Sequence, residues 1–242
     1  MQPKLIALGL SAALCASADT IITVFDGVFA PSNWTSSILT DTNNIHTSFA
    51  AGQVLTGGDP NEYRHTTLTA SPNGSGLCNT IRVQNEYLGF SLAAGTPVTS
   101  IGYSFDLIYF NPNSLPYPTE GYYLALFQNG KTWVPSSYVP SDTSTWATHT
   151  VSGLTASGFC LAGNVNALDC GQHPLFDGSA GMDFGYVTAN GLPNSDYYGL
   201  GTLSGLDNFT VNVQTTTPEP GTYGMAAAGL ALLAWARRRR FR

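Results

Sequence analysis

Apolar and polar residues alternate along much of the chain between residues 19 and 213, with a period of two instead of the 3.6 of a helix. The clearest example is VTSIGYSFDLIYF (98–110). Alternate positions there carry large side chains, namely Ile101, Tyr103, Phe105, Leu107 and Tyr109. Three of the intervening positions carry Gly102, Ser104 and Asp106, so the pattern predicts a long strand with one buried face.

Other segments have the same character and predict further strands: NTIRV (79–83), YLGFSL (87–92), WATHTV (146–151), DFGYVTA (183–189) and LDNFTVNV (206–213). YYLALFQ (122–128) is apolar on both faces, as in a central strand, and Asn129-Gly130 predicts a tight hairpin turn after it. Many short strands separated by Gly, Pro and Asn predict an all-β fold. We expect a single jelly-roll-like β-sandwich over residues 19–213.

The first 18 residues have the three parts of a secretory signal peptide. Lys4 supplies the basic start, an apolar run follows from Leu5 to Leu14, and Ala16-Ser17-Ala18 is the small-x-small pattern that signal peptidase accepts. We therefore expect export through the Sec machinery and cleavage after Ala18.

A second apolar segment, Gly221 to Ala236, is followed by four consecutive arginines. Its sixteen residues fall just short of the roughly 17–25 that a spanning helix needs, so the segment is marginal as a permanent anchor. The positive-inside rule keeps the arginines in the cytoplasm and leaves the rest of the chain outside. The sequence thus predicts an exported body, residues 19–213, joined by a polar linker (214–217) to a tail that tethers it to the inner membrane.

This tail, residues 218–242, resembles the PEP-CTERM sorting signal of Gram-negative bacteria. The resemblance rests on a Pro-Glu-Pro motif, the glycine-containing apolar segment and the basic block, that is, on Pro218, Glu219, Pro220, Arg237, Arg238, Arg239 and Arg240. In that family an exosortase, an integral-membrane peptidase, recognises the signal and cuts near the Pro-Glu-Pro. The resemblance implies that exosortase recognises these residues, that membrane attachment is transient, and that the product is associated with the cell surface or with exopolysaccharide.

Charge is distributed unevenly along the chain. The whole sequence has a net charge of −6, but the body contains three basic residues, Arg64, Arg82 and Lys131, against fourteen acidic ones, which gives it −11. Such an acidic surface repels nucleic acid, so we expect no nucleic-acid partner.

Three cysteines remain after removal of the signal peptide: Cys78, Cys160 and Cys170. Export favours their oxidation. A Cys160–Cys170 bridge would close a loop rich in glycine and asparagine, and we favour this pairing, although connectivity is not fixed by sequence alone. Cys78 is then buried or left over.

Catalytic motifs are absent from the sequence. There is no Gly-x-Ser-x-Gly elbow, zinc-binding His-Glu-x-x-His or phosphate-binding loop. Glu62, Glu86 and Glu120 are isolated, and the Glu-x-Asp-x-x-Glu pattern of sandwich glucanases is missing. We predict that the protein is not an enzyme, with a divergent hydrolase whose carboxylates meet only in the fold as an alternative.

Two stretches, FDGVFAPSNW (25–34) and GLDNFTV (205–211), resemble the opening and closing parts of bacterial carbohydrate-binding jelly rolls. The resemblance implies a structural calcium with Asp26 and Asp207 as ligands, whereas both residues also suit turns, which is the interpretation we favour. No other cofactor is expected.

Aromatic residues in loop-like stretches are the candidates for stacking on sugars: Trp133, Tyr138, Trp146, Tyr197 and Tyr198. Packing in the core is the alternative for each of them. The sequence therefore predicts a non-catalytic surface or exopolysaccharide-matrix protein, with a glycan-binding module as the first alternative and a hydrolase as the second.

Overall fold

A computed structural model of the chain describes residues 17–41, 46–70, 79–110, 120–141, 143–163, 167–192, 200–218 and 229–230. These residues form thirteen strands: β1 (Ser17–Asp26), β2 (Trp34–Asp41), β3 (His46–Gly58), β4 (Asn61–Ala70), β5 (Asn79–Leu92), β6 (Val98–Tyr109), β7 (Glu120–Gln128), β8 (Lys131–Pro135), β9 (Val139–Ser141), β10 (Ala147–Leu154), β11 (Phe159–Leu161), β12 (Met182–Leu192) and β13 (Leu200–Pro218). Two short 3-10 turns, Pro31–Asn33 and Ala156–Gly158, precede β2 and β11.

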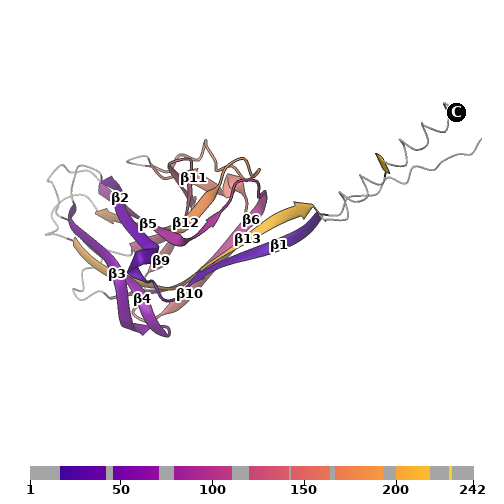
Figure 1. The fold of residues 1–242 in the computed structure, drawn as a ribbon. Helices are drawn as coiled ribbons and strands as arrows, with labels where there is room; N and C mark the ends of the chain where they lie inside the picture. Colours follow the sequence, from indigo (N-terminus) through magenta and orange to yellow (C-terminus); the bar gives the residue numbers. More distant parts are fainter. Residues whose placement is uncertain are drawn as a thin grey trace, which may run out of the picture. The chain divides into compact units, whose positions relative to one another are not determined.

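The strands belong to two sheets, and most of the strands are labelled in Figure 1. The first has the order β10-β6-β13-β4-β3, with β1 also paired to β13; the second has the order β11-β8-β7-β12-β5-β2, with β9 also paired to β7. The chain crosses repeatedly from one sheet to the other, and the side chains between the sheets form the core. This arrangement confirms the all-β, jelly-roll-like sandwich, and residues 21–215 form one compact unit.

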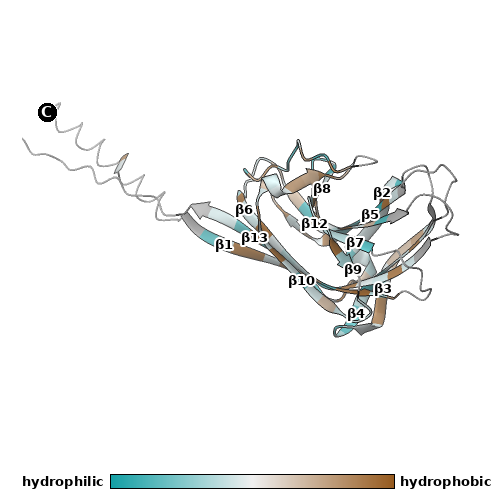
Figure 2. Ribbon diagram, turned by 180° about the vertical axis from the view of Figure 1, so that it is seen from behind, coloured by the Kyte–Doolittle hydropathy of each residue, from teal (hydrophilic) through white to brown (hydrophobic). Residues whose placement is uncertain are grey.

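The core is built from alternate positions of the strands, as period-two patterning requires. On β6 the inward residues Ile101, Tyr103, Phe105 and Leu107 are almost completely buried. They belong to one cluster with residues of the opposite sheet, among them Leu124, Leu126, Phe184 and Tyr186. Figure 2 shows that single strands carry both apolar and polar residues.

Asp26 fixes the start of the sandwich. One carboxylate oxygen accepts the backbone N–H groups of Val28 and Phe29, both at 2.9 Å, and the other accepts Nε1–H of Trp34 at 2.7 Å. Trp34 is buried, and the Arg64 guanidinium lies 5.1 Å from the centroid of its ring. Asp26 is therefore a turn residue that also positions a core tryptophan.

A polar cluster lies between the sheets around Glu120, which is completely buried. The Ser204 hydroxyl donates to Glu120, and the Tyr122 hydroxyl lies 2.6 Å from the Ser204 hydroxyl. Burial raises the pKa of Glu120 to about 7, although hydrogen bonds from Ser204 and Thr188 oppose the shift. The cluster gives the interior an ionisable group in the neutral pH range.

Two expectations about element boundaries are wrong. Residues 79–83 and 87–92 belong to one strand, β5, because the chain between them stays paired with its neighbours. Residues 214–217, predicted as a linker, continue β13 up to Pro218. In the apolar tail segment the structure describes Gly229 and Leu230, which are helical, and the described residues include no helix long and apolar enough to cross a membrane.

Candidate functional site

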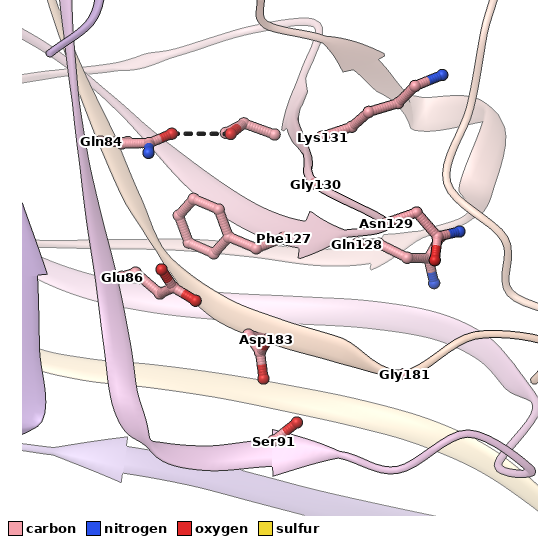
Figure 3. Close-up of a pocket in the computed structure, with 11 residues that line it drawn as sticks. Gln84, Glu86, Ser91, Phe127, Gln128, Asn129, Gly130, Lys131, Gly181 and Asp183 are labelled. Carbon is pink, nitrogen blue, oxygen red and sulfur yellow. Dashed lines mark hydrogen bonds between the residues drawn. The ribbon is translucent and has the colours of Figure 1, made fainter. Parts of the chain in front are cut away.

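A pocket of about 430 Å³ lies over the outer face of the second sheet, where β5, β12 and β7 run side by side (Figure 3). Alternation along these strands decides which side chains reach it. Phe184 and Tyr186 of β12 face the core, so Asp183 faces outward, as do Glu86 on β5 and Phe127 on β7. The pocket is lined by Gln84, Glu86, Ser91, Phe127, Gln128, Asn129, Gly130, Lys131, Thr132, Gly181 and Asp183.

The β7–β8 hairpin forms one rim of the pocket. Asn129 and Gly130 have positive φ angles of 55° and 69°, the conformation that a tight two-residue hairpin requires. The predicted Asn-Gly turn is confirmed, and it places Asn129 and Lys131 beside the hollow.

A register shift between β5 and β12 shapes the opposite side. Tyr87 is paired with Phe184, but Ser91 is paired with the preceding residue, Asp183, so residues 88–90 are extra on β5. Such a bulge bends a strand and redirects its side chains. It brings the Ser91 hydroxyl next to Asp183 at the edge of the pocket (Figure 3).

Hydrogen bonds fix the amide side chains in the wall. Gln128 accepts the backbone N–H of Leu175 at 2.7 Å and donates to its carbonyl at 3.0 Å. Gln84 donates to Ser37 at 3.0 Å and accepts from Thr132 at 2.8 Å. The side chains of Gln84 and Gln128 are therefore held by protein partners before any ligand arrives.

Two carboxylates share the pocket. Glu86 and Asp183 project into the same hollow beside the ring of Phe127 (Figure 3). Burial, and secondly the charge of Asp183, raises the pKa of Glu86. The pocket thus combines a half-buried aromatic face with hydroxyl, amide and carboxylate groups.

The aromatic residues proposed from the sequence do not come together. Trp133 is 4% exposed and lies in the core, so the prediction of sugar stacking is wrong for this residue. Trp146 packs against Tyr63, with ring centroids 5.4 Å apart, and donates to the Gly57 carbonyl. Tyr138 is exposed and packs against Tyr123. Tyr197 and Tyr198 lie outside the described residues.

Both carboxylates proposed as calcium ligands already accept protein donors. Asp26 holds Trp34, as described above, and Asp207 accepts the backbone N–H groups of Asp59 and Asn208. Burial raises the pKa of Asp207, and the nearby charges of Asp106 and Asp59 add to the shift. Within the described ranges no three His, Cys, Asp or Glu side chains gather in a group that could hold a metal ion.

A disulfide joins Cys160 to Cys170, the pair favoured in the sequence analysis. Cys160 is buried on β11, and Leu168 in the loop packs on the apolar cluster of the outer face, which includes Val134 and Val187. Cys78 and Ala16 lie outside the described residues, and Ala18 is the second residue of β1.

Sequence reasoning missed the residues that line the pocket. Glu86 and Asp183 are far apart in sequence, and their proximity depends on the pairing of β5 with β12. The sequence predicts that Phe127 lies in a strand that is apolar on both faces, and this is correct for β7. Nothing in the local sequence indicates that the outer face of β7 borders a pocket.

Comparisons with known proteins bear mainly on the tail. Residues 216–240 match a family model described as the PEP-CTERM protein-sorting motif. No curated protein matches the chain. Among solved structures, a cellulose-induced protein, Cip1, is 10% identical with a TM-score of 0.39, over 78% of this chain and 96% of that one. A second, titled as a structural analysis of an exo-beta-agarase, is 13% identical with a TM-score of 0.36, over 82% of this chain and 25% of that one.

At these identities and TM-scores, neither structural likeness bears on function. The tail match covers the motif predicted from Pro218-Glu219-Pro220 and the arginine block. The chain therefore carries a PEP-CTERM sorting motif at residues 216–240, which implies an exported protein that is anchored transiently in the membrane and processed by an exosortase.

Proposed function

We propose that the protein is a non-catalytic component of the cell surface or exopolysaccharide matrix and that its sandwich binds a saccharide in the pocket over β5, β12 and β7. The sorting motif accounts for delivery of the protein. The observation that carries the binding role is the pocket itself, with Phe127 as its aromatic wall and polar groups around it.

The pocket has the properties that saccharide binding requires. Its volume of about 430 Å³ falls within the range of small-molecule sites, roughly 300–1,000 Å³. The apolar face of a sugar ring can pack on Phe127, and its hydroxyls can reach Ser91, Asn129 and the two carboxylates. Because Gln84 and Gln128 are already held by protein partners, their side chains lose little conformational freedom on binding.

A glycan array with the exported protein, purified after processing, tests this proposal. We expect binding to a restricted set of glycans and loss of that binding in Phe127→Ala. Tyr138→Ala is the matched control, because Tyr138 is exposed but does not line the pocket. If no glycan binds, or if Phe127→Ala binds like the wild type, the proposed role is wrong.

Delivery is tested separately at the sorting motif. Replacing Pro218, Glu219 and Pro220 with alanine should abolish processing of the tail. Mass spectrometry of the C-terminus of the exported protein checks this directly. Unchanged processing would show that the Pro-Glu-Pro sequence is not what the peptidase recognises.

Hydrolysis is the second candidate function, because Glu86 and Asp183 line one pocket and the pKa of Glu86 is raised. Glycoside hydrolysis uses two carboxyl groups on either side of the scissile bond. New reducing ends, formed from a glycan that binds on the array and lost in Glu86→Gln, would favour this function over binding alone.

A further inference from the structure

The electrostatics of the pocket narrow the class of saccharide it takes. Glu86 and Asp183 repel each other, and their mutual charge contributes to the raised pKa of Glu86. Neither carboxylate receives a hydrogen bond or an ion pair from any residue that the structure describes. Two carboxylates in a partly desolvated pocket without such partners are a costly arrangement for the free protein.

Lys131, the basic residue in the lining, does not relieve this repulsion. Its ammonium donates to Gln172 Oε1 at 3.1 Å and lies 5.6 Å from the centroid of the Trp133 ring. Figure 3 shows its side chain directed away from Glu86 and Asp183. The pocket therefore contains two negative charges and the aromatic face of Phe127, while the ammonium of Lys131 interacts with other residues.

We propose that the pocket recognises an amino sugar with a free, protonated amine. The ammonium lies between Glu86 and Asp183, and the ring of the sugar packs on Phe127. This inference rests on the proposed saccharide-binding function and specifies its ligand.

Three properties support a cationic sugar. A charge-assisted hydrogen bond to a carboxylate is about twice as strong as a neutral one, and the ammonium can donate to both carboxylates. The face of an aromatic ring such as Phe127 attracts a cation. The body as a whole carries a net charge of −11, which concentrates cationic polymers near its surface and repels acidic polysaccharides.

A metal ion fits the pocket less well than an ammonium. Calcium takes about six to eight oxygen ligands, and its sites are rich in carboxylates. This pocket offers two carboxylates, and the described part of the chain has no group of three acidic, His or Cys side chains arranged to hold a metal. The geometry favours a small organic cation over a bare ion.

Three β-1,4-linked tetrasaccharides that differ only at C2 test the inference: glucosamine, N-acetylglucosamine and glucose. Each is titrated calorimetrically into the processed, exported protein at about pH 6, where the amine is protonated. We expect the glucosamine tetramer to bind at least about tenfold more tightly than the other two tetramers, as hydrogen bonds between charged groups imply. EDTA should not change the affinity for the glucosamine tetramer. This preference should disappear in Asp183→Asn and in Glu86→Gln.

Asp177→Asn is the charge-matched control, because Asp177 is exposed and lies outside the pocket lining. It should keep the preference for glucosamine, and thermal unfolding should show that all three variants fold. Equal affinity of the wild type for glucosamine and glucose overturns the amino-sugar inference but leaves saccharide binding standing. A preference that survives in both pocket variants, or that requires calcium, also overturns it. If none of the three tetramers nor any glycan on the array binds, both proposals fail.

Discussion

Phe127 on β7 lies directly opposite Asp183 on β12, so an aromatic ring and a carboxylate are neighbours on the outer face of the second sheet. This pair defines the chemistry of the pocket, because one member offers an apolar surface and the other an acceptor. Both side chains are positioned by central strands and not by loops, which keeps their geometry fixed.

Phe127→Ala should weaken saccharide binding about five- to thirtyfold, because it removes the ring surface on which a sugar packs, worth about 1–2 kcal/mol. The saccharide affinity of Phe127→Leu should lie between those of the alanine variant and the wild type, since leucine keeps apolar area but has no aromatic face. Isothermal titration with a glycan that binds on the array checks both variants. Wild-type affinity in Phe127→Ala would mean that the ring does not contact the ligand.

Glu120 makes stability depend on pH. The pKa of this carboxyl is raised from 4.5 in the unfolded chain to about 7 in the folded protein, so folding takes up a proton between these values. Stability is therefore highest below about pH 4.5 with respect to this group and falls as the pH rises through 7, by on the order of 3 kcal/mol.

Glu120→Gln should remove the contribution of this carboxyl to the pH dependence of stability, because glutamine has a similar size and stays neutral. Urea unfolding of both proteins at about pH 5 and about pH 8 measures it. We expect the wild type to lose more stability than the variant between the two conditions. Parallel loss in both would show that other groups cause the pH dependence.

Asp26→Ala should destabilise the fold by about 1–3 kcal/mol, because it leaves the Trp34 indole N–H and two backbone N–H groups without their acceptor. Asp177→Ala is the matched control. Asp177 also accepts a backbone N–H two residues ahead, that of Ser179, but it is exposed, so water can replace the bond. Chemical unfolding that ranks Asp177→Ala as the more damaging change would contradict this account of Asp26.

The sequence predicts the central strands well for a physical reason. The inward residues of β6 and the paired apolar faces of β7 are set by burial, which imposes a local pattern, and the Asn129-Gly130 turn follows from backbone sterics. The pocket is different, because Glu86 meets Asp183 only through strand pairing and a three-residue register shift. Dependence on strand pairing also explains why the prediction of sugar stacking by Trp133 is wrong. Trp133 pairs with Leu126, whose side chain lies on the inner face, whereas Phe127, the next residue on β7, faces the pocket.

The central claim is that the pocket over β5, β12 and β7 is the saccharide site. Backbone amide chemical shifts, recorded while the protein is titrated with a saccharide that binds it, test this claim most directly. The pocket contains two glycines, Gly130 and Gly181, whose amides report on it, and Gly95 and Gly153 lie outside its lining. We predict that the signals of Gly130, Gly181 and Asp183 shift on binding while those of Gly95 and Gly153 stay in place. Shifts centred instead on Tyr63 and Trp146, with the pocket signals unchanged, would contradict the assignment of the pocket as the saccharide site.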